Sequence, residues 1–598
     1  MMNDPQKGWL LAGLQAISGK KEARLSIALA TLAATGVGVY ALRRHLIAWW
    51  LNFPQPAYKV TLKRNIRIPM ADGITLATDH YRPSSNGSET DDFPTILIRT
   101  PYSKDGIEGL VNTFICHRFA ERGYHVMCQD TRGTFSSGGE FEPFVHEAAD
   151  GRATLDWIGE QPWFNGSVGM WGMSYPGYTI WAAASSHPPM LKALVPAITG
   201  SYLGPEDGRI FPLDLVLNWM LILDSLYDDE VNLFEMVRRT GNIERQRAIL
   251  SPGYTHLPLS ELDQAVLDKE ISFFKVWQEH PEPEDPYWTE VNYSTVVNEV
   301  TAPAHFVTGW FDIFLTRTLK DYATLKTAGR NPYLTIGPWH HLNFDRFFSI
   351  REALDWFDTH LKGKTEKLRP NPVRIYLTGA NQWLELEAWP PPAQEAVYFL
   401  SRIPNGEGEL RQERPLHEAE PDTYCFDPAD PTPNIGGPLL SHAAGTYDNR
   451  VLESRADVLT YTTEPLEAPL DIVGTVKLTL YVTTSLPHSD FFGRLCDVHP
   501  DGRSMNICDG LVRLEPGSIS PQSDGTLQIE LEMVPTAHRF LKGHRLRLQV
   551  SGGAHPRFAR NLGTGEPMPT ATRMEICQKA IYLDPAHPSA LILPIILA

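Results

Sequence analysis

The stretch VGMWGMSYPGY at residues 168–178 decides the fold of this chain. Its apolar first half predicts a short buried strand, and its end predicts the first turn of a helix, where Pro176 is tolerated. A serine between a strand and a helix, here Ser174, describes a nucleophile elbow. Gly172 and Gly177 flank it because a sharp turn leaves no room for Cβ atoms.

The second glycine comes one residue later than in the generic Gly-x-Ser-x-Gly pattern. At this point a purely structural Gly-Ser turn remains the alternative, because short motifs of this kind recur by accident.

Buried strands and helical patterns alternate on both sides of the elbow. Apolar runs typical of parallel strands occupy residues 93–100, 124–130, 191–196, 304–310 and 331–339. Helical patterns separate most of these runs, so the sequence predicts a parallel sheet with right-handed crossovers.

Two regions depart from this pattern. From about residue 211 to 287 the sequence predicts helices with no strand between them, which is where a lid would lie; a plain surface excursion is the alternative. Beyond about residue 390, segments such as 475–482 and 527–533 alternate with period two and are punctuated by Pro and Gly. They predict a β-sandwich or jelly roll.

The predicted fold class is therefore α/β: an α/β-hydrolase domain with an inserted helical cap, followed by an all-β jelly-roll domain of the galactose-binding type. The predicted boundaries are an N-terminal segment at 1–55, the hydrolase domain at 56–205 and 296–390, the cap at 206–295, and the jelly roll at 391–598.

Charge and cysteine content exclude some functions. A formal net charge of −18 argues against nucleic acid as a partner, because phosphate binding requires a basic face. The six cysteines form no CxxC pair and no cluster with zinc spacing. Free, mostly buried thiols are favoured over disulfides in a chain with so large a core.

Residues 25–42 form an uncharged stretch between Lys20, Lys21 and Arg24 on one side and Arg43 and Arg44 on the other. Its length just suffices to span a bilayer, which predicts a single-pass anchor and a membrane-anchored protein. An amphipathic or buried helix and a cleaved signal are the alternatives; with either, the protein would be cytoplasmic or exported and soluble.

Candidate partners for Ser174 lie at the ends of predicted strands, where open parallel sheets build their sites. A serine nucleophile needs a base to accept its proton and an acid to orient that base. Asp312 and His341 stand at strand ends and complete the order Ser, Asp, His that α/β-hydrolases use. His340 is the rival of His341, and sequence alone barely separates the two.

Several ordered motifs make the chain resemble a known family. The matching segments are RTPYSK at 99–104, QDTRG at 129–133, GMWGMSY at 169–175, GWFD at 309–312, IGPWHH at 336–341, RLCDV at 494–498 and GHRLRL at 543–548. The sequence resembles the X-Pro dipeptidyl-peptidase and cocaine-esterase group of α/β-hydrolases (CocE/NonD, peptidase S15-type), which includes glutaryl and cephalosporin acylases. The likeness runs from about residue 58 to 583.

The resemblance implies a role for each matched position. Ser174 would be the nucleophile, Asp312 the orienting acid and His341 the base, because the family's histidine stands two places after the Trp of Gly-Pro-Trp. The Tyr102 hydroxyl and the Tyr175 backbone N–H would form the oxyanion hole; without the resemblance, Tyr102 reads as an aromatic packed on the sheet. His340 departs from the small or polar residue usual there, and the N-terminal segment is not part of the shared pattern.

The sequence thus predicts a serine hydrolase that cleaves ester or amide acyl bonds through an acyl-enzyme, without metal or organic cofactor. An Xaa-Pro dipeptidyl-peptidase is the main alternative. It would need carboxylates to hold a free α-amine, and the candidates are Asp207, Asp214, Asp224, Asp228, Asp229 and Glu230, unless these form a solvated acidic face.

A membrane-anchored binding protein with an inactive hydrolase domain is the non-enzymatic hypothesis. The expected partners are a small ester, an amide or a short peptide, with membrane contact through residues 25–42 and a homodimer left open.

Overall fold

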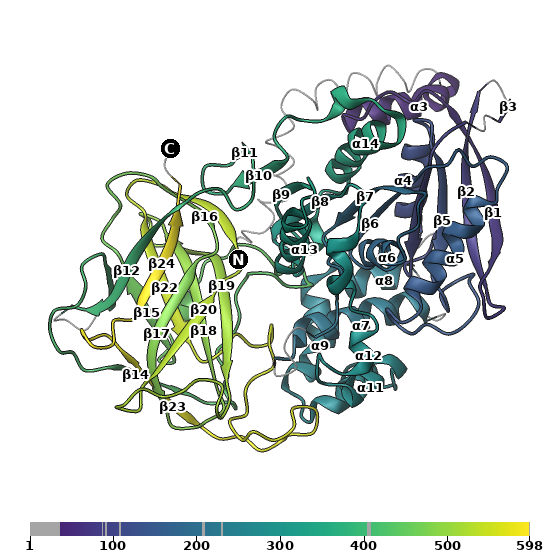
Figure 1. Cartoon of the computed structure of the whole chain (residues 1–598). Coiled ribbons are helices and arrows are strands. Elements are labelled where there is room, and N and C mark those ends of the chain that lie inside the picture. The colour runs from purple at the N-terminus through teal and green to yellow at the C-terminus, as the bar shows by residue number, and fades with distance from the viewer. Residues whose placement is uncertain are drawn as a thin grey trace.

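The computed structural model describes residues 36–85, 88–89, 92–106, 109–205, 210–228, 231, 233–403 and 408–596. The chain forms two lobes, each built on one large sheet, with a group of helices between them (Figure 1). This arrangement confirms the predicted class, an α/β-hydrolase-like domain followed by an all-β domain.

The first lobe is a mainly parallel sheet of eleven strands, in which β3 (Ser88–Glu89) pairs only with β2. The other strands, in spatial order, are β1 (Lys59–Pro69), β2 (Thr75–Ser85), β5 (His125–Asp130), β4 (Thr95–Thr100), β6 (Val168–Met173), β7 (Leu191–Ala197), β8 (His305–Phe311), β9 (Tyr333–His340), β10 (Val373–Leu377) and β11 (Gln382–Leu386). Strands β4, β5 and β8 are buried along their whole length, because helices cover both faces of a parallel sheet.

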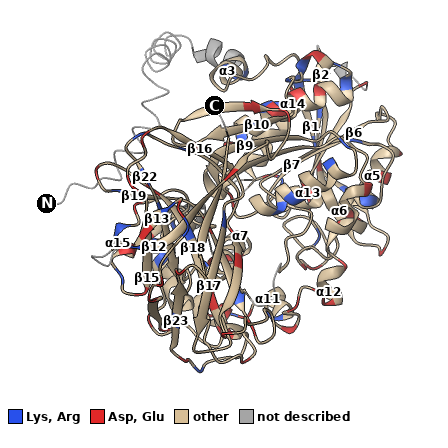
Figure 2. Ribbon diagram, turned by 60° about the vertical axis from the view of Figure 1, so that its left-hand side comes forward, with Lys and Arg blue, Asp and Glu red and all other residues tan. Residues whose placement is uncertain are grey.

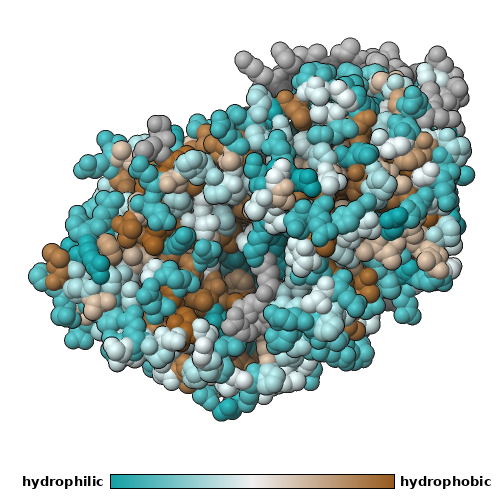
Figure 3. Space-filling model, in the orientation of Figure 1, coloured by the Kyte–Doolittle hydropathy of each residue, from teal (hydrophilic) through white to brown (hydrophobic). Residues whose placement is uncertain are grey.

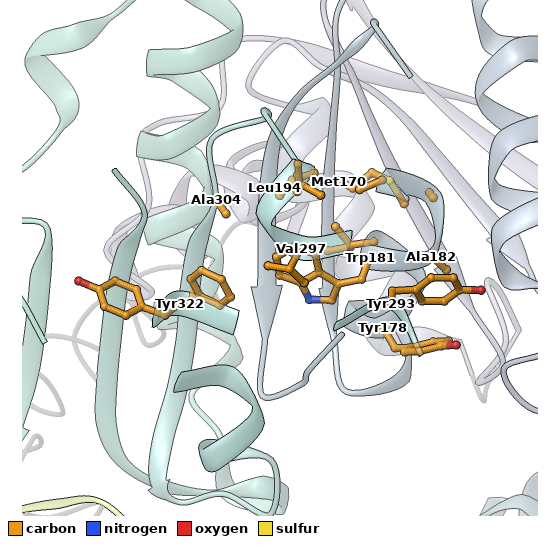
Figure 4. Packing of buried hydrophobic residues seen from close by; sticks show 14 of the residues in the cluster. Met170, Tyr178, Trp181, Ala182, Leu194, Tyr293, Val297, Ala304 and Tyr322 are labelled. Carbon is orange, nitrogen blue, oxygen red and sulfur yellow. The ribbon is translucent and has the colours of Figure 1, made fainter. Parts of the chain in front are cut away.

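Helices pack on the two faces of this sheet and create two apolar layers. One layer contains α4 (Leu110–Ala120) and α14 (Arg346–Lys362), and the other contains α5 (Glu147–Gly159), α6 (Tyr175–Ala184) and α13 (Leu315–Thr327). Figure 4 shows the second layer, where Trp181 of α6 lies among side chains from the sheet and from the segment around Val297. Burial of this helix fixes the position of its N-terminus, where Ser174 lies.

The segment between β7 and β8 is helical in the described part of the chain, as the sequence predicts. Its helices are α7 (Leu213–Tyr227), α8 (Leu233–Gly241), α9 (Ile243–Thr255), α10 (Leu262–Leu267), α11 (Ser272–Glu279) and α12 (Pro286–Thr289). Leu217 and Leu221 of α7 form the centre of its own small core, together with Phe274 of α11. We call this segment the cap.

The second lobe is a thirteen-stranded, largely antiparallel sheet system. Its strands are β12 (Gln394–Arg402), β13 (Gly408–Arg411), β14 (Asp422–Phe426), β15 (Val458–Thr462), β16 (Leu470–Gly474), β17 (Lys477–Thr484), β18 (Ser489–Val498), β19 (Ser504–Leu514), β20 (Leu527–Glu532), β21 (Thr536–Phe540), β22 (Arg545–Ser551), β23 (Cys577–Tyr582) and β24 (Ala590–Ile595). Alternating side chains of β17 and β20 point into its core, which is the period-two pattern seen in the sequence.

The two lobes are joined by backbone hydrogen bonds as well as by the chain. Thr378, directly after β10, donates its N–H to the carbonyl of Ala537 (3.0 Å) and accepts from the N–H of Arg539 (2.8 Å). A single β-bridge between Thr378 and His538 thereby connects the end of β10 with β21 of the second lobe. The domain boundaries proposed from the sequence remain predictions, although the first sheet ends at Leu386 and the second begins at Gln394.

The structure corrects the prediction for the N-terminal segment. Helix α3 (Gly36–Trp50) contains only the end of the predicted span and continues through Arg43 and Arg44, while residues 25–35 lie outside the described residues. Over the part of the chain that the structure describes, no helix is both long and apolar enough to cross a membrane. The predictions of a single-pass anchor and of a membrane-anchored location are therefore wrong, whereas membrane contact through residues 25–42 stays a prediction.

The end of α3 packs on the hydrolase domain instead. Ala48 is fully buried, the Arg44 guanidinium donates to the carbonyl of Tyr58 (2.5 Å), and Arg351 of α14 donates to the carbonyl of Leu51 (2.9 Å). The C-terminal part of α3 is thus held against the hydrolase domain.

Candidate active site

The elbow holds Ser174 in a conformation that few non-glycine residues adopt, with φ 59° and ψ −128°. A Cβ added at Gly172 would lie 2.2 Å from the Pro176 carbonyl oxygen, and one added at Gly177 would lie 2.5 Å from a Thr199 methyl carbon. The strand, the turn and the helix therefore approach so closely that only glycine fits at these two positions. Backbone strain of this kind costs about 1–3 kcal/mol and persists only where the surrounding packing enforces it.

The side chains of Ser174, His341 and Asp312 form one chain of hydrogen bonds. The Ser174 hydroxyl lies 3.0 Å from His341 Nε2, and His341 Nδ1 lies 2.7 Å from Asp312 Oδ2. The second carboxylate oxygen, Oδ1, accepts from the N–H of Phe314 at 2.8 Å. Both oxygens of a buried carboxylate are thus satisfied, and the imidazole is fixed between serine and acid.

His340 stands beside this chain but takes no part in it. Its backbone N–H donates to the Asn343 side chain (2.7 Å), and its ring approaches Gly445 of the second lobe. Burial, with the neighbouring imidazoles of His442 and His341, lowers the pKa of His340 to about 4. Of the two histidines, the structure brings only His341 into contact with Ser174 and Asp312.

Tyr102 reaches the site from the loop after β4. The Tyr102 oxygen accepts a hydrogen bond from Trp219 Nε1 of the cap at 3.2 Å, and it also interacts with the Ser174 side chain. Burial raises the pKa of Tyr102 to about 12, so the phenol keeps its proton at neutral pH. Because the Tyr102 oxygen already accepts a hydrogen bond from Trp219, its own hydroxyl hydrogen is available to point toward Ser174.

Tyr175 is the first residue of α6, so its backbone N–H belongs to the turn in which a helix has no internal acceptors. Its phenol is anchored below the elbow: it lies 3.0 Å from Glu147 Oε1 and accepts from the N–H of Phe144 at 2.8 Å. Glu147 in turn pairs with Arg99 at 2.7 Å, and both side chains are buried. Burial raises the pKa of Glu147 against the opposing charge of Arg99.

Sequence reasoning missed the roles of Arg99 and Glu147. Arg99 belongs to the RTPYSK segment, but Glu147 lies 48 residues further on and stands in no motif. Two buried charges that support the Ser174 turn leave no local sequence pattern. An arginine inside an apolar strand is nevertheless a signal that a buried partner is required.

A cavity of about 760 Å³ opens above Ser174 between the hydrolase domain, the cap and the second lobe. The rings of Phe144, Trp219 and Trp277 are nearly parallel to one another, with interplanar angles of 3–11°. Leu511 and Phe558 of the second lobe also line the wall. Figure 3 shows apolar side chains around the hollow where the two lobes meet.

Three of the six carboxylates proposed as amine ligands are engaged elsewhere. Asp224 pairs with Lys269 and Arg239, Asp228 pairs with Lys269, and Asp214 accepts from Tyr254 at 3.1 Å. None of these three lines the cavity. Asp207, Asp229 and Glu230 lie outside the described residues. Basic and acidic residues are both spread over the two lobes (Figure 2).

Among the residues that the structure describes, the lining carboxylates other than Asp312 belong to the second lobe. Asp509 is buried between Arg494 and Arg557, which hold its pKa below the usual range against the effect of burial. Glu532 is exposed at the cavity wall.

Fold and site together define an α/β-hydrolase whose serine elbow opens into a cavity closed by a cap and a β domain. Residues 72–343 match the family model described as X-Pro dipeptidyl-peptidase (S15 family). Residues 367–592 match the model described as X-Pro dipeptidyl-peptidase C-terminal non-catalytic domain. Cocaine esterase of Rhodococcus sp. (strain MB1 Bresler) is 33% identical over 577 residues, which cover 89% of this chain and 98% of that protein. The chain belongs to this S15 family and is a serine hydrolase.

Solved structures support the same fold. An aminopeptidase from a marine sediment Thaumarchaeota archaeon is 24% identical and superposes with a TM-score of 0.75 over 91% of this chain and 98% of its own. An α-amino acid ester hydrolase is also 24% identical, with a TM-score of 0.75 over 90% of this chain and 97% of its own. At 24% identity, these two structures establish only the fold of this chain.

The buried Arg99–Glu147 pair predicts a stability effect. Glu147→Ala should lower the free energy of unfolding by about 3–5 kcal/mol, because Arg99 would stay buried without its counter-charge. Urea denaturation followed by circular dichroism measures this. The control is Asp156→Ala on the same helix, which removes an exposed i,i+4 pair with Arg152 and should cost less than about 1 kcal/mol. Equal, small losses for both variants would contradict the buried role of Glu147.

Proposed function

We propose that this chain hydrolyses ester or amide acyl bonds through an acyl-enzyme on Ser174, with His341 as general base and Asp312 as the orienting acid. The observation that carries the proposal is the chain of short contacts from Ser174 through His341 to Asp312 at the floor of the cavity. Ester and peptide bonds are the substrates that the family and its esterase relative imply.

In the first half-reaction, Ser174 Oγ attacks the acyl carbon while His341 Nε2 takes the hydroxyl proton. Asp312 holds the Nδ1–H side of the ring and stabilises the imidazolium that forms. The tetrahedral intermediate then collapses, the bond to the alcohol or amine breaks, and His341 gives its proton to that leaving group. In the second half-reaction, a water molecule gives a proton to His341 and attacks the acyl carbon. Ser174 leaves with that proton, and the acid is released.

The negative charge on the substrate oxygen would be held by the Tyr102 hydroxyl and the Tyr175 N–H. The high pKa of Tyr102 supports this role, because the phenol remains a donor throughout the neutral range. A single oxyanion-hole donor is worth about 2.7–4 kcal/mol in the transition state. The hydrogen bond from Trp219 links that donor to the cap.

The character of the cavity favours an apolar acyl or leaving group. Aromatic faces from the hydrolase domain and the cap stand close to Ser174. Binding of an apolar substrate against these rings is favourable because it removes apolar surface from water. An ester is favoured over an amide because an alcohol is the better leaving group.

An Xaa-Pro dipeptidyl-peptidase remains the second candidate. The family description favours it, and the exposed carboxylate of Glu532 at the cavity wall could bind a free α-amine. The engaged state of Asp214, Asp224 and Asp228 argues against the amine site expected in the cap.

A fluorophosphonate probe tests the mechanism, because it labels an activated serine whatever the substrate. We expect wild-type protein and His340→Ala to be labelled, and Ser174→Ala and His341→Ala to lose labelling, since the structure brings only His341 to Ser174. The two histidine variants are matched controls for each other. Labelling that survives in His341→Ala and disappears in His340→Ala would overturn the assignment of the base.

A substrate panel tests the bond class. We expect p-nitrophenyl esters of benzoate and of short fatty acids to be hydrolysed with kcat/KM at least about 100-fold above that for Gly-Pro and Ala-Pro anilides. Glu532→Gln should leave ester hydrolysis unchanged. Rapid anilide cleavage that falls selectively in Glu532→Gln would instead establish the dipeptidyl-peptidase.

A further inference from the structure

A cluster of three histidines around one carboxylate lies in the second lobe, away from the Ser174 cavity. Asp497, near the end of β18, is buried, and His544 Nδ1 lies 2.8 Å from its Oδ1. His538 Nε2 lies 3.1 Å from Oδ2, and His499 Nε2 lies 3.7 Å from the same oxygen. The hydrolase mechanism uses none of these four residues.

The ligand atoms of Asp497, His499 and His544 lie within 4.8 Å of one another. A metal bound tetrahedrally with bonds of about 2.0–2.1 Å has ligand atoms about 3.3 Å apart. Asp497 contacts His544 through Oδ1 at 2.8 Å and His499 through Oδ2 at 3.7 Å, and these two distances lie on either side of that separation. A small movement of the side chains would therefore create the geometry without a change in the backbone.

The backbone already holds the three residues in place. Asp497 pairs with Leu546 across β18 and β22, so Asp497 and His544 stand at the same end of adjacent strands. His499 lies in the tight turn that follows β18, where its N–H donates to the Arg503 carbonyl at 2.8 Å. Its side chain is 27% exposed, which gives an ion a route from solvent.

A second layer of contacts orients the carboxylate. His538 contacts Oδ2, the carboxylate oxygen that His499 also approaches, and His538 Nδ1 lies 2.9 Å from the hydroxyl of Thr378 in the hydrolase domain. Outer contacts of this kind fix ligand orientation in metal sites. Arg503 approaches His499 Nδ1 at 3.4 Å, but it is exposed and pairs with Asp501, so it can turn away when Nδ1 carries the proton.

We propose that Asp497, His499 and His544 form a binding site for a zinc-type divalent ion, with solvent as the fourth ligand. Two imidazoles and a carboxylate suit Zn²⁺, whereas Ca²⁺ and Mg²⁺ prefer all-oxygen sets. Through His538 and Thr378 the ion would be connected to the seam between the two lobes. The site is independent of acyl transfer.

The test uses the full-length protein, freed of metal with dipicolinate and then titrated with Zn²⁺ alone. We expect one zinc per chain after gel filtration, measured by elemental analysis, and a higher melting temperature in its presence. His499→Gln is the main variant because the exposed ring can be replaced without disturbing the core. It should bind zinc at least about 100-fold more weakly, since even an outer-layer partner contributes 10–100-fold.

His587→Gln is the matched control. His587 stands in the same lobe between two carboxylates, Asp524 at 2.8 Å and Asp584 at 3.1 Å, and its loss should leave zinc binding unchanged. Tetrahedral Co²⁺ gives an intense visible absorption that should appear in wild type and vanish in His499→Gln. A wild-type protein that retains no zinc overturns the proposal, and so does a His499→Gln protein that binds as tightly as wild type.

Discussion

The strained backbone of Ser174 is the constraint on which the rest of the site depends. Its positive φ directs the hydroxyl out of the β6–α6 turn and toward His341. Only a turn packed tightly on every side holds a serine in this way, and Gly172 and Gly177 make that packing feasible. From below, the buried Arg99–Glu147 pair fixes the phenol of Tyr175 and with it the start of α6.

Three separate parts of the chain meet at this turn. The parallel sheet brings Asp312 and His341 to the same edge as Ser174, because parallel strands end on one side. The cap contributes Trp219, which binds Tyr102 and forms part of the aromatic wall. The second lobe closes the cavity and is itself fastened to the sheet edge at Thr378. A cavity assembled from three parts can change its substrate preference through any of them, while the turn stays constant.

Periodicity explains how much of this structure the sequence could predict. Continuous apolar runs predict the parallel strands, and period-two alternation predicts the β lobe. Because neither strand pattern occurs between residues 211 and 287, the sequence predicts a helical cap there. The positions of Asp312 and His341 followed because strand ends are easy to locate. His341 and His340 were inseparable because adjacent residues share every sequence signal, and only the direction of the chain after β9 distinguishes them.

The failures have physical causes too. The apolar stretch 25–42 predicts an anchor because hydropathy does not show where a helix begins and ends, whereas α3 begins at Gly36 and continues through Arg43 and Arg44. The cap acids were proposed as amine ligands because sequence does not show that Asp224 and Asp228 share Lys269. Glu147 escaped notice because its partners are distant in the chain.

A crystal structure of the protein inactivated by an aryl phosphonate tests the central claim most directly, since it fixes nucleophile, oxyanion donors and cavity in one measurement. The account predicts phosphorus bonded to Ser174 Oγ, with φ of that residue still positive. The phosphonyl oxygen should lie about 2.7–3.1 Å from both the Tyr102 hydroxyl and the Tyr175 nitrogen, with the aryl group against Phe144 and Trp219. A phosphonyl oxygen turned away from both donors, or an adduct on another residue, would contradict it.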